Sequence, residues 1–338
     1  MERVAVSGIG LELPGLAGPA ALLSPPPPSP DPPRFAPEEK LGRTGLLYKD
    51  RATRLALCAT REALLDAGLP VAAPEQVAGE GLGVVVSSNL GNLDTVCRVV
   101  ESIHAASVKV TSPLDLPNAS SNVIASTIAI RFGCRAVNLT VCNGATAGVD
   151  ALHFAANAIR AGRARRIIVV GVEPFNPVVG RLMRESAIAW LGTADILRLG
   201  EGAGAVVLEA EGSALARGAR IYGRIGGYGF APGMDLAGSI SAALNGNGGP
   251  PSLWFTPNGG YPPTSESIQH ALRLWAGAPP RRVDLAAAVG ETYGALGVLQ
   301  AVAACSWLGK HGEGPALLSS GAAWGDGAAS LVIGPQAA

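Results

Sequence analysis

Aromatic and charged residues are scarce in this chain of 338 residues, at 5% and 15% of the sequence. Lysine plus arginine and aspartate plus glutamate both number 26, so charge favours neither nucleic acid nor a membrane surface as a partner. No apolar run reaches about 20 residues, and the first residues carry Glu2 and are typical of a strand rather than a signal peptide. We therefore expect a cytoplasmic protein with small-molecule or protein partners.

Cysteine pairs at short spacing are also missing. The five cysteines are odd in number, widely separated and free of C-x-x-C spacing: Cys58, Cys97, Cys134, Cys142 and Cys305. This usage suits a reducing compartment and argues against a metal or redox site. We expect no metal and no bound cofactor.

Apolar runs and helical spacing alternate along the chain. Strands are predicted at 3–9, 81–89, 135–141, 165–174, 202–212, 219–230, 283–290 and 327–335. Helices are predicted at 50–68, 120–133, 144–162, 265–277 and 294–309, and loops at the Pro-rich 24–35 and at 231–264. The alternation predicts an α/β fold with a mostly parallel sheet layered with helices, in two strand–helix–strand halves.

Cys142 stands between a predicted strand and a predicted helix. Unpaired N–H groups and the positive end of a helix dipole favour the nucleophilic thiolate, and the same N–H groups can bind an oxyanion. The helix that follows is apolar almost all round, so we expect Cys142 to lie deep, at the end of a tunnel. A structural core cysteine is the alternative, because free cysteine is among the most buried residue types.

Several segments resemble the β-ketoacyl synthases of the thiolase superfamily. "TVCNGATAGVDALHFA" is similar to the family's nucleophile junction with "TACSSS" and "ALHLA", and "LPNASSNVIASTIAIRFG" is similar to its dimer-interface segment. "LGEGAGAVVLE", "GETYGALGVLQAVAA" and "WGDGAASLVI" match later family motifs in the right order. The resemblance implies a thiolase-like αβαβα fold, with a half at 1–215 that carries the nucleophile Cys142 and a second half at 216–338.

The chain departs from this family at its catalytic positions. The resemblance places Glu291 and Asn258 where the family has two histidines, and Ala286 where it has a lysine. Trp324, followed by Gly325, matches the gating phenylalanine loop, which implies that both line the substrate tunnel.

These substitutions change the chemistry that is available. An ionised carboxylate cannot donate the hydrogen bonds that polarise a malonyl thioester, so Glu291 argues against decarboxylative condensation. Glu291 can act as a general base, and Asn258 can act as an oxyanion donor. The structural alternatives are a helix-start carboxylate for Glu291, a turn residue before Gly259 for Asn258 and a core aromatic for Trp324. No histidine is assigned a catalytic role.

Two readings of the function follow. The first is an acyltransferase of polyketide or fatty-acid-type biosynthesis that loads Cys142 from an acyl-carrier-protein phosphopantetheine or coenzyme A thioester. It would then transfer the acyl group to an acceptor other than malonyl thioester. The second is a non-condensing partner subunit, similar to a chain-length factor, in a ketosynthase heterodimer. A condensing enzyme that uses Glu291 and Asn258 in unusual roles is a third. The first reading implies an acyl carrier protein as a partner. All three imply a homodimer or heterodimer, because helix 120–133 and strand 137–141 would otherwise leave an apolar patch exposed.

Overall fold

The computed structural model describes residues 2–25, 35–71, 81–113, 115–195, 198–245, 250–275, 277–311, 314–321 and 327–336. Most of the Pro-rich stretch and both Trp324 and Gly325 lie outside these ranges, so predictions about them stay predictions. No helix among the described residues is long and apolar enough to cross a membrane.

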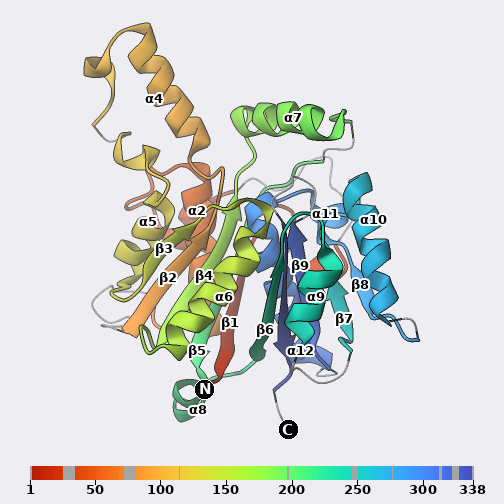
Figure 1. Cartoon of the computed structure of the whole chain (residues 1–338). Helices are drawn as coiled ribbons and strands as arrows, with labels where there is room; N and C mark the ends of the chain where they lie inside the picture. The colour runs from red at the N-terminus through yellow and green to blue at the C-terminus, as the bar shows by residue number, and fades with distance from the viewer. Residues whose placement is uncertain are drawn as a thin grey trace.

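One mixed sheet organises the described part of the chain (Figure 1). Its strand order is β3-β2-β4-β5-β1-β6-β10-β9-β7-β8. The strands are β1 (Val4–Glu12), β2 (Leu82–Ser87), β3 (Asn138–Val141), β4 (Arg166–Glu173), β5 (Gly202–Ala210), β6 (Gly223–Ala231), β7 (Leu253–Phe255), β8 (Arg281–Val283), β9 (Ala316–Gly321) and β10 (Ala328–Gly334). Strands β1 to β5 make up one half of this order and strands β6 to β10 make up the other. Counted outward from the centre of the sheet, both halves have their first, fifth, fourth, second and third strand in that order, so the topology repeats.

Parallel pairing is confined to the two ends of this sheet. It joins β3, β2 and β4 at one end and β8, β7 and β9 at the other. The six central strands, which follow one another in the sheet as β4, β5, β1, β6, β10 and β9, pair antiparallel. The prediction of a mostly parallel sheet is therefore wrong. In each half the fifth strand lies between the fourth and the first and runs antiparallel to both: β5 lies between β4 and β1, and β10 lies between β9 and β6.

The helices, apart from those that project at either end of the molecule, form three layers with the two halves of the sheet between them. They are α1 (Pro37–Leu41), α2 (Arg51–Asp66), α4 (Leu93–Ala105), α5 (Val123–Phe132), α6 (Ala147–Arg160), α7 (Pro177–Leu191), α8 (Glu211–Ala216), α9 (Leu236–Leu244), α10 (Pro262–Ala271), α11 (Leu285–Val289) and α12 (Leu296–His311). Helices α2 and α5 share a core cluster with β2, β4 and β5, and α9 and α10 share another with β7, β9 and β10. Helices α6 and α12 lie in the middle cluster, against strands of both halves. The predicted αβαβα layering is confirmed.

Strand β4 shows why this layering suits the sequence. Ile167 and Val169 face the central cluster, whereas Ile168 and Val170 face the outer one. Successive side chains of a strand point to opposite faces, so a strand covered on both sides reads as one continuous apolar run. The same logic makes α12 apolar on every side, because it is buried from Leu296 to Leu308.

Two predicted segments are wrong in detail. The predicted loop 231–264 contains α9 and β7, and the predicted strand 283–290 is the end of β8 followed by α11. Both of these helices start at an aspartate cap: Asp235 accepts from the Gly238 N–H, and Asp284 accepts from the Ala287 N–H. Caps of this kind start a helix even where small residues hide its periodicity.

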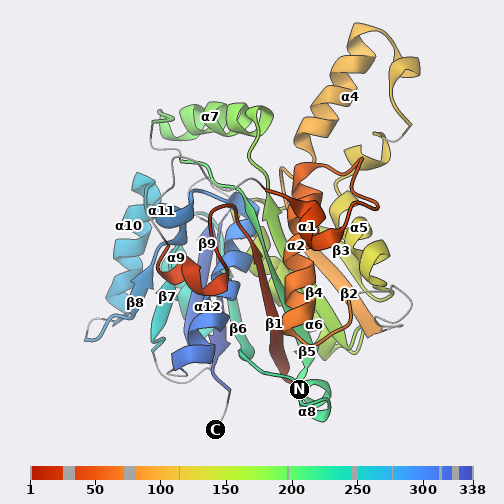
Figure 2. The ribbon, with the colours of Figure 1, turned by 180° about the vertical axis from the view of Figure 1, so that it is seen from behind.

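Helices α4 and α7 project at one end of the molecule, and the two termini lie at the other (Figures 1 and 2). The two helices contact each other. The apolar cluster beneath α7 contains Leu90, Val179, Met183, Ala187 and Tyr261, with Ala145 and Tyr293 packed against it. This cluster adjoins both turns described next.

Candidate active site

Cys142 directly follows β3. This strand is the last one at its edge of the described sheet, and Cys142 is exposed in the single chain. Helix α6 begins only at Ala147, after a short 3-10 turn over Gly144–Thr146. The prediction that Cys142 lies deep is therefore wrong for the single chain, because Cys142 follows the edge strand of the described sheet.

The turn after Cys142 is held by two side chains. Asn89 Oδ1 accepts the Gly144 N–H at 2.9 Å, and Asn89 Nδ2 donates to the Gly144 carbonyl at 3.1 Å. On the other side, Asn143 Nδ2 donates to Asp150 Oδ2 at 2.6 Å. Gly144 has a φ of +90°, a left-handed conformation that glycine adopts readily. Its N–H is already used by Asn89 and is not free for an oxyanion.

Glu291 is buried, with 6% of its surface exposed. Its backbone N–H donates to Arg198, and its carbonyl accepts from Gly200. The Glu291 carboxylate accepts from Asn258 Nδ2 at 2.8 Å and from the Tyr293 N–H at 2.7 Å. Burial raises the pKa of Glu291, and the hydrogen bonds from Asn258 and Tyr293 oppose that rise.

Asn258 follows β7, and its side chain accepts the Gly260 N–H at 3.0 Å. The structure thus brings two of the predicted residues, Glu291 and Asn258, into direct hydrogen-bond contact. It also supports the alternative reading of each: Asn258 is a turn residue, and Glu291 accepts an N–H at the start of the 3-10 turn Tyr293–Ala295. Ala286, at the family's lysine position, is buried in α11.

The Cys142 turn and the Glu291 turn pack against each other. A Cβ built on Gly148 would lie 2.9 Å from the Gly294 carbonyl oxygen and 2.9 Å from the Gly297 nitrogen. Only a glycine permits this approach of α6 to the start of α12. The close packing of the two central helices is what brings the cysteine segment beside the glutamate segment.

Sequence reasoning missed two residues of this neighbourhood. Asn89 lies just beyond β2, and Glu173 is the last residue of β4. A carboxylate that ends an otherwise apolar strand, in "IIVVGVEP", was the available signal for Glu173. A single asparagine after a strand is typical of any turn, so Asn89 carried no comparable signal.

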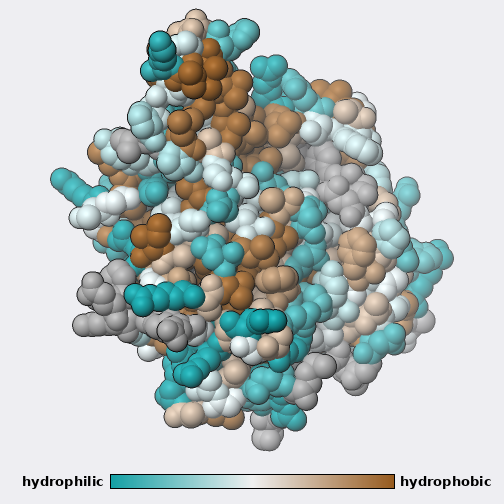
Figure 3. All heavy atoms as spheres, turned by 60° about the vertical axis from the view of Figure 1, so that its left-hand side comes forward, coloured by the Kyte–Doolittle hydropathy of each residue, from teal (hydrophilic) through white to brown (hydrophobic). Residues whose placement is uncertain are grey.

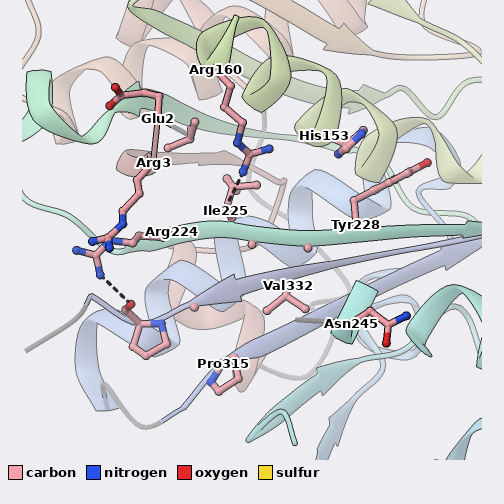
Figure 4. A pocket seen from close by; sticks show the side chains of 15 residues that line it. Glu2, Arg3, His153, Arg160, Arg224, Ile225, Tyr228, Asn245, Pro315 and Val332 are labelled. Atoms are coloured by element: carbon pink, nitrogen blue, oxygen red, sulfur yellow. Dashed lines mark hydrogen bonds between the residues drawn. The ribbon is translucent and has the colours of Figure 1, made fainter. Parts of the chain in front are cut away.

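A cavity of about 680 Å³ lies elsewhere, between α6 and β6 (Figure 4). Figure 4 shows His153 and Arg160 reaching from the helix toward the strand that carries Ile225 and Tyr228. His153 stacks on Tyr228 with ring centroids 3.9 Å apart, and burial lowers the pKa of His153. None of the residues lining this cavity is a predicted site residue.

Comparison with known proteins identifies the family. The model of the β-ketoacyl synthase N-terminal domain matches residues 43–214. The chain belongs to the β-ketoacyl synthase family. Its relatives include 3-oxoacyl-[acyl-carrier-protein] synthase 2 of Vibrio harveyi, which is 30% identical over 56% of this chain and 48% of that protein. The chain thus spans about half the length of several curated family members that it matches.

Two further matches cover nearly the whole chain. The ketoacyl synthase alpha subunit of the tetracenomycin polyketide synthase of Streptomyces glaucescens is 26% identical over 93% of this chain and 86% of its own. The solved structure of the ishigamide ketosynthase/chain length factor superimposes with a TM-score of 0.84 at 22% identity, covering 99% of this chain and 100% of the other. This match shows that the thiolase-like fold extends over the described chain.

Proposed function

We propose that the chain is an acyltransferase of the ketosynthase family whose nucleophile is Cys142. The observation that carries this proposal is that Cys142 is exposed rather than packed in the core. Its place in "TVCNGATAG", which resembles the nucleophile junction of the family, supports the nucleophile role. Its sulfur attacks the carbonyl carbon of an acyl-carrier-protein or coenzyme A thioester. A new carbon–sulfur bond forms to Cys142, and the carrier leaves as a thiol with the proton. The acyl group then passes to an acceptor other than malonyl thioester.

Glu291 is the proposed general base of the second step. Burial raises the pKa of Glu291, so its carboxylate is a stronger base than an exposed one. It would take the proton of the incoming nucleophile. Asn258 holds one carboxylate oxygen of Glu291, so it fixes the base in place. The predicted oxyanion role of Asn258 requires the second hydrogen of the same amide.

A partner subunit that does not condense is the second candidate. Figure 3 shows apolar side chains gathered over α4, with a second group lower on the same face. The exposed apolar residues of this region are Val100, Ile103, Val108, Val110, Leu116 and Ile130. Together with the edge strand β3, they form a surface suited to another ketosynthase-like chain, in a homodimer or a heterodimer.

Intact-protein mass spectrometry with acyl-carrier-protein thioesters separates the two candidates. The wild-type chain and a Cys97→Ala control are expected to gain the acyl mass, whereas Cys142→Ala is expected to gain none. Glu291→Gln is expected to gain the acyl mass and to release it more slowly than wild type once an acceptor is added. No adduct with any donor, combined with co-purification of a second ketosynthase-like chain, would establish the partner-subunit reading instead.

A further inference from the structure

Glu173 is a buried carboxylate that the proposed chemistry does not use. It is 2% exposed, and hydrogen-bond donors surround both of its oxygens. Glu173 Oε1 accepts from the Asn89 backbone N–H at 2.7 Å and from Asn89 Nδ2 at 3.3 Å. Oε2 accepts from the Leu90 N–H at 2.9 Å and from Ser88 Oγ at 3.4 Å. No arginine, lysine or histidine is among these described partners, so neutral donors alone hold the carboxylate.

Asn89 connects this carboxylate to the cysteine turn. Its backbone N–H and its side-chain amide nitrogen donate to Glu173. The side-chain amide also hydrogen-bonds the N–H and the carbonyl of Gly144. A planar amide that meets both the N–H and the carbonyl of one residue fixes the two peptide units on either side of that residue. Gly144 is two residues beyond Cys142, so this grip sets the path of the chain that carries the thiol.

The same segment also contacts the glutamate turn. Ser87 Oγ donates to the Gly294 carbonyl at 2.5 Å, and a Cβ on Gly294 would lie 2.1 Å from Asn89 Nδ2. The end of β2 therefore lies between the turn after Cys142 and the turn after Glu291, and it fixes one against the other.

We propose that Glu173 and Asn89 are positioning residues for Cys142, with Glu173 orienting the Asn89 amide and Asn89 holding the Gly144 peptide. The inference rests on the proposed function for its consequence in acyl transfer, but its geometry is independent of that function. Burial raises the pKa of Glu173 to about 7, against the effect of the hydrogen bonds from Asn89, Leu90 and Ser88.

Hydrogen exchange of the Gly144 amide tests the geometry without any substrate. Asn89→Ala, Asn89→Asp and Glu173→Gln are compared with Asn92→Ala, a matched control. Asn92 is an asparagine three residues further along, and its amide donates to the Asn118 carbonyl instead. We expect the Gly144 amide to exchange about tenfold faster in Asn89→Ala, because one hydrogen bond is lost. Asn89→Asp places an oxygen where the Gly144 carbonyl needs a donor, so it too should loosen the turn. Asn92→Ala is expected to match wild type.

Reactivity of the thiol tests the consequence. We expect Asn89→Ala and Glu173→Gln to lower the first-order rate constant of acyl loading onto Cys142 at least tenfold, while KM changes less than twofold. General destabilisation of the protein does not produce a loss in the rate constant alone. In the same variants, alkylation of Cys142 by iodoacetamide, relative to Cys97 in the same chain, should change at least threefold.

The outcomes distinguish this inference from the function on which it rests. A wild-type chain that gains no acyl group, but whose alkylation ratio responds to Asn89→Ala, refutes the proposed function and supports the positioning role. Unchanged Gly144 exchange in Asn89→Ala, or faster exchange with unaltered thiol reactivity, overturns the positioning role whether or not the chain loads acyl groups.

Discussion

The two halves of the molecule share one topology but treat their central turns differently. In each half, a short 3-10 turn leads into a central helix, α6 in the first half and α12 in the second. The turn of the first half carries an exposed Cys142, and the turn of the second carries a buried Glu291. A repeated scaffold has thus produced one open position and one closed position beside each other.

Backbone geometry separates the two turns as well. The first turn reaches its left-handed position with Gly144, whereas the second places Tyr293 at a φ of +42°. The left-handed conformation is unfavourable for a residue other than glycine, so contacts around Tyr293 must stabilise it. Tyr293 packs against the apolar cluster under α7, and its N–H donates to Glu291. The closed turn is therefore fixed by packing as well as by hydrogen bonds, whereas the open turn is held by the hydrogen bonds of Asn89 and Asp150.

The largest expected effect comes from separating the two halves where they touch. A Cβ on Gly297 would lie 2.6 Å from the Val149 nitrogen, so Gly297→Val forces α12 away from α6. We expect the free energy of unfolding to fall by more than about 3 kcal/mol. Gly212→Ala is the control, because nothing lies within 4 Å of a Cβ there. Urea denaturation of both variants measures the difference, and equal midpoints would show that the halves tolerate separation.

The next effect concerns the pH dependence of stability through Glu173. Its pKa is about 7 in the folded chain and 4.5 ordinarily, so the folded state binds the proton more tightly. This contribution to stability is present in full below pH 4.5 and is lost as the pH rises through 7. Relative to Glu173→Gln, wild type should lose at most about 3 kcal/mol of unfolding free energy across that window. Glu291 is present in both proteins, so its titration cancels. Parallel pH profiles of the two proteins would contradict the raised pKa.

The smallest effect tests the open turn alone. Gly144→Ala places a Cβ on a residue with a φ of +90°, which should cost about 1–2 kcal/mol of unfolding free energy. Gly212→Ala again serves as the reference, because its position is neither crowded nor left-handed. If thermal unfolding shows no loss for Gly144→Ala, the turn is free to adopt another path, and the contrast between the two turns fails.

Sequence patterns predicted most of the helices that cover the sheet. Helix α2 was predicted from its spacing, and its start is fixed by Asp50, which accepts the Thr53 N–H. Helix α9 was missed because "LAGSISAAL" consists mostly of small and weakly polar residues, whose helical face shows only against the strands that it covers. The pairing direction of strands depends on connections between distant segments, which local periodicity does not record.

The candidate site was only partly readable from sequence. Cys142, Glu291 and Asn258 were found through family resemblance, and the hydrogen bond between Asn258 and Glu291 joins residues 33 positions apart. Asn89 follows β2 and Glu173 ends β4, and no spacing rule connects Asn89 to Gly144, which lies 55 residues away. Such partners become visible only when the sheet places the ends of β2 and β4 side by side.

Strand β3 pairs only with β2 among the described strands, so one row of its backbone groups faces outward along its length. Any chain segment that adds to this row ends beside Cys142. Under the proposed function, pairing along this row would change the access of an acyl thioester to the thiol.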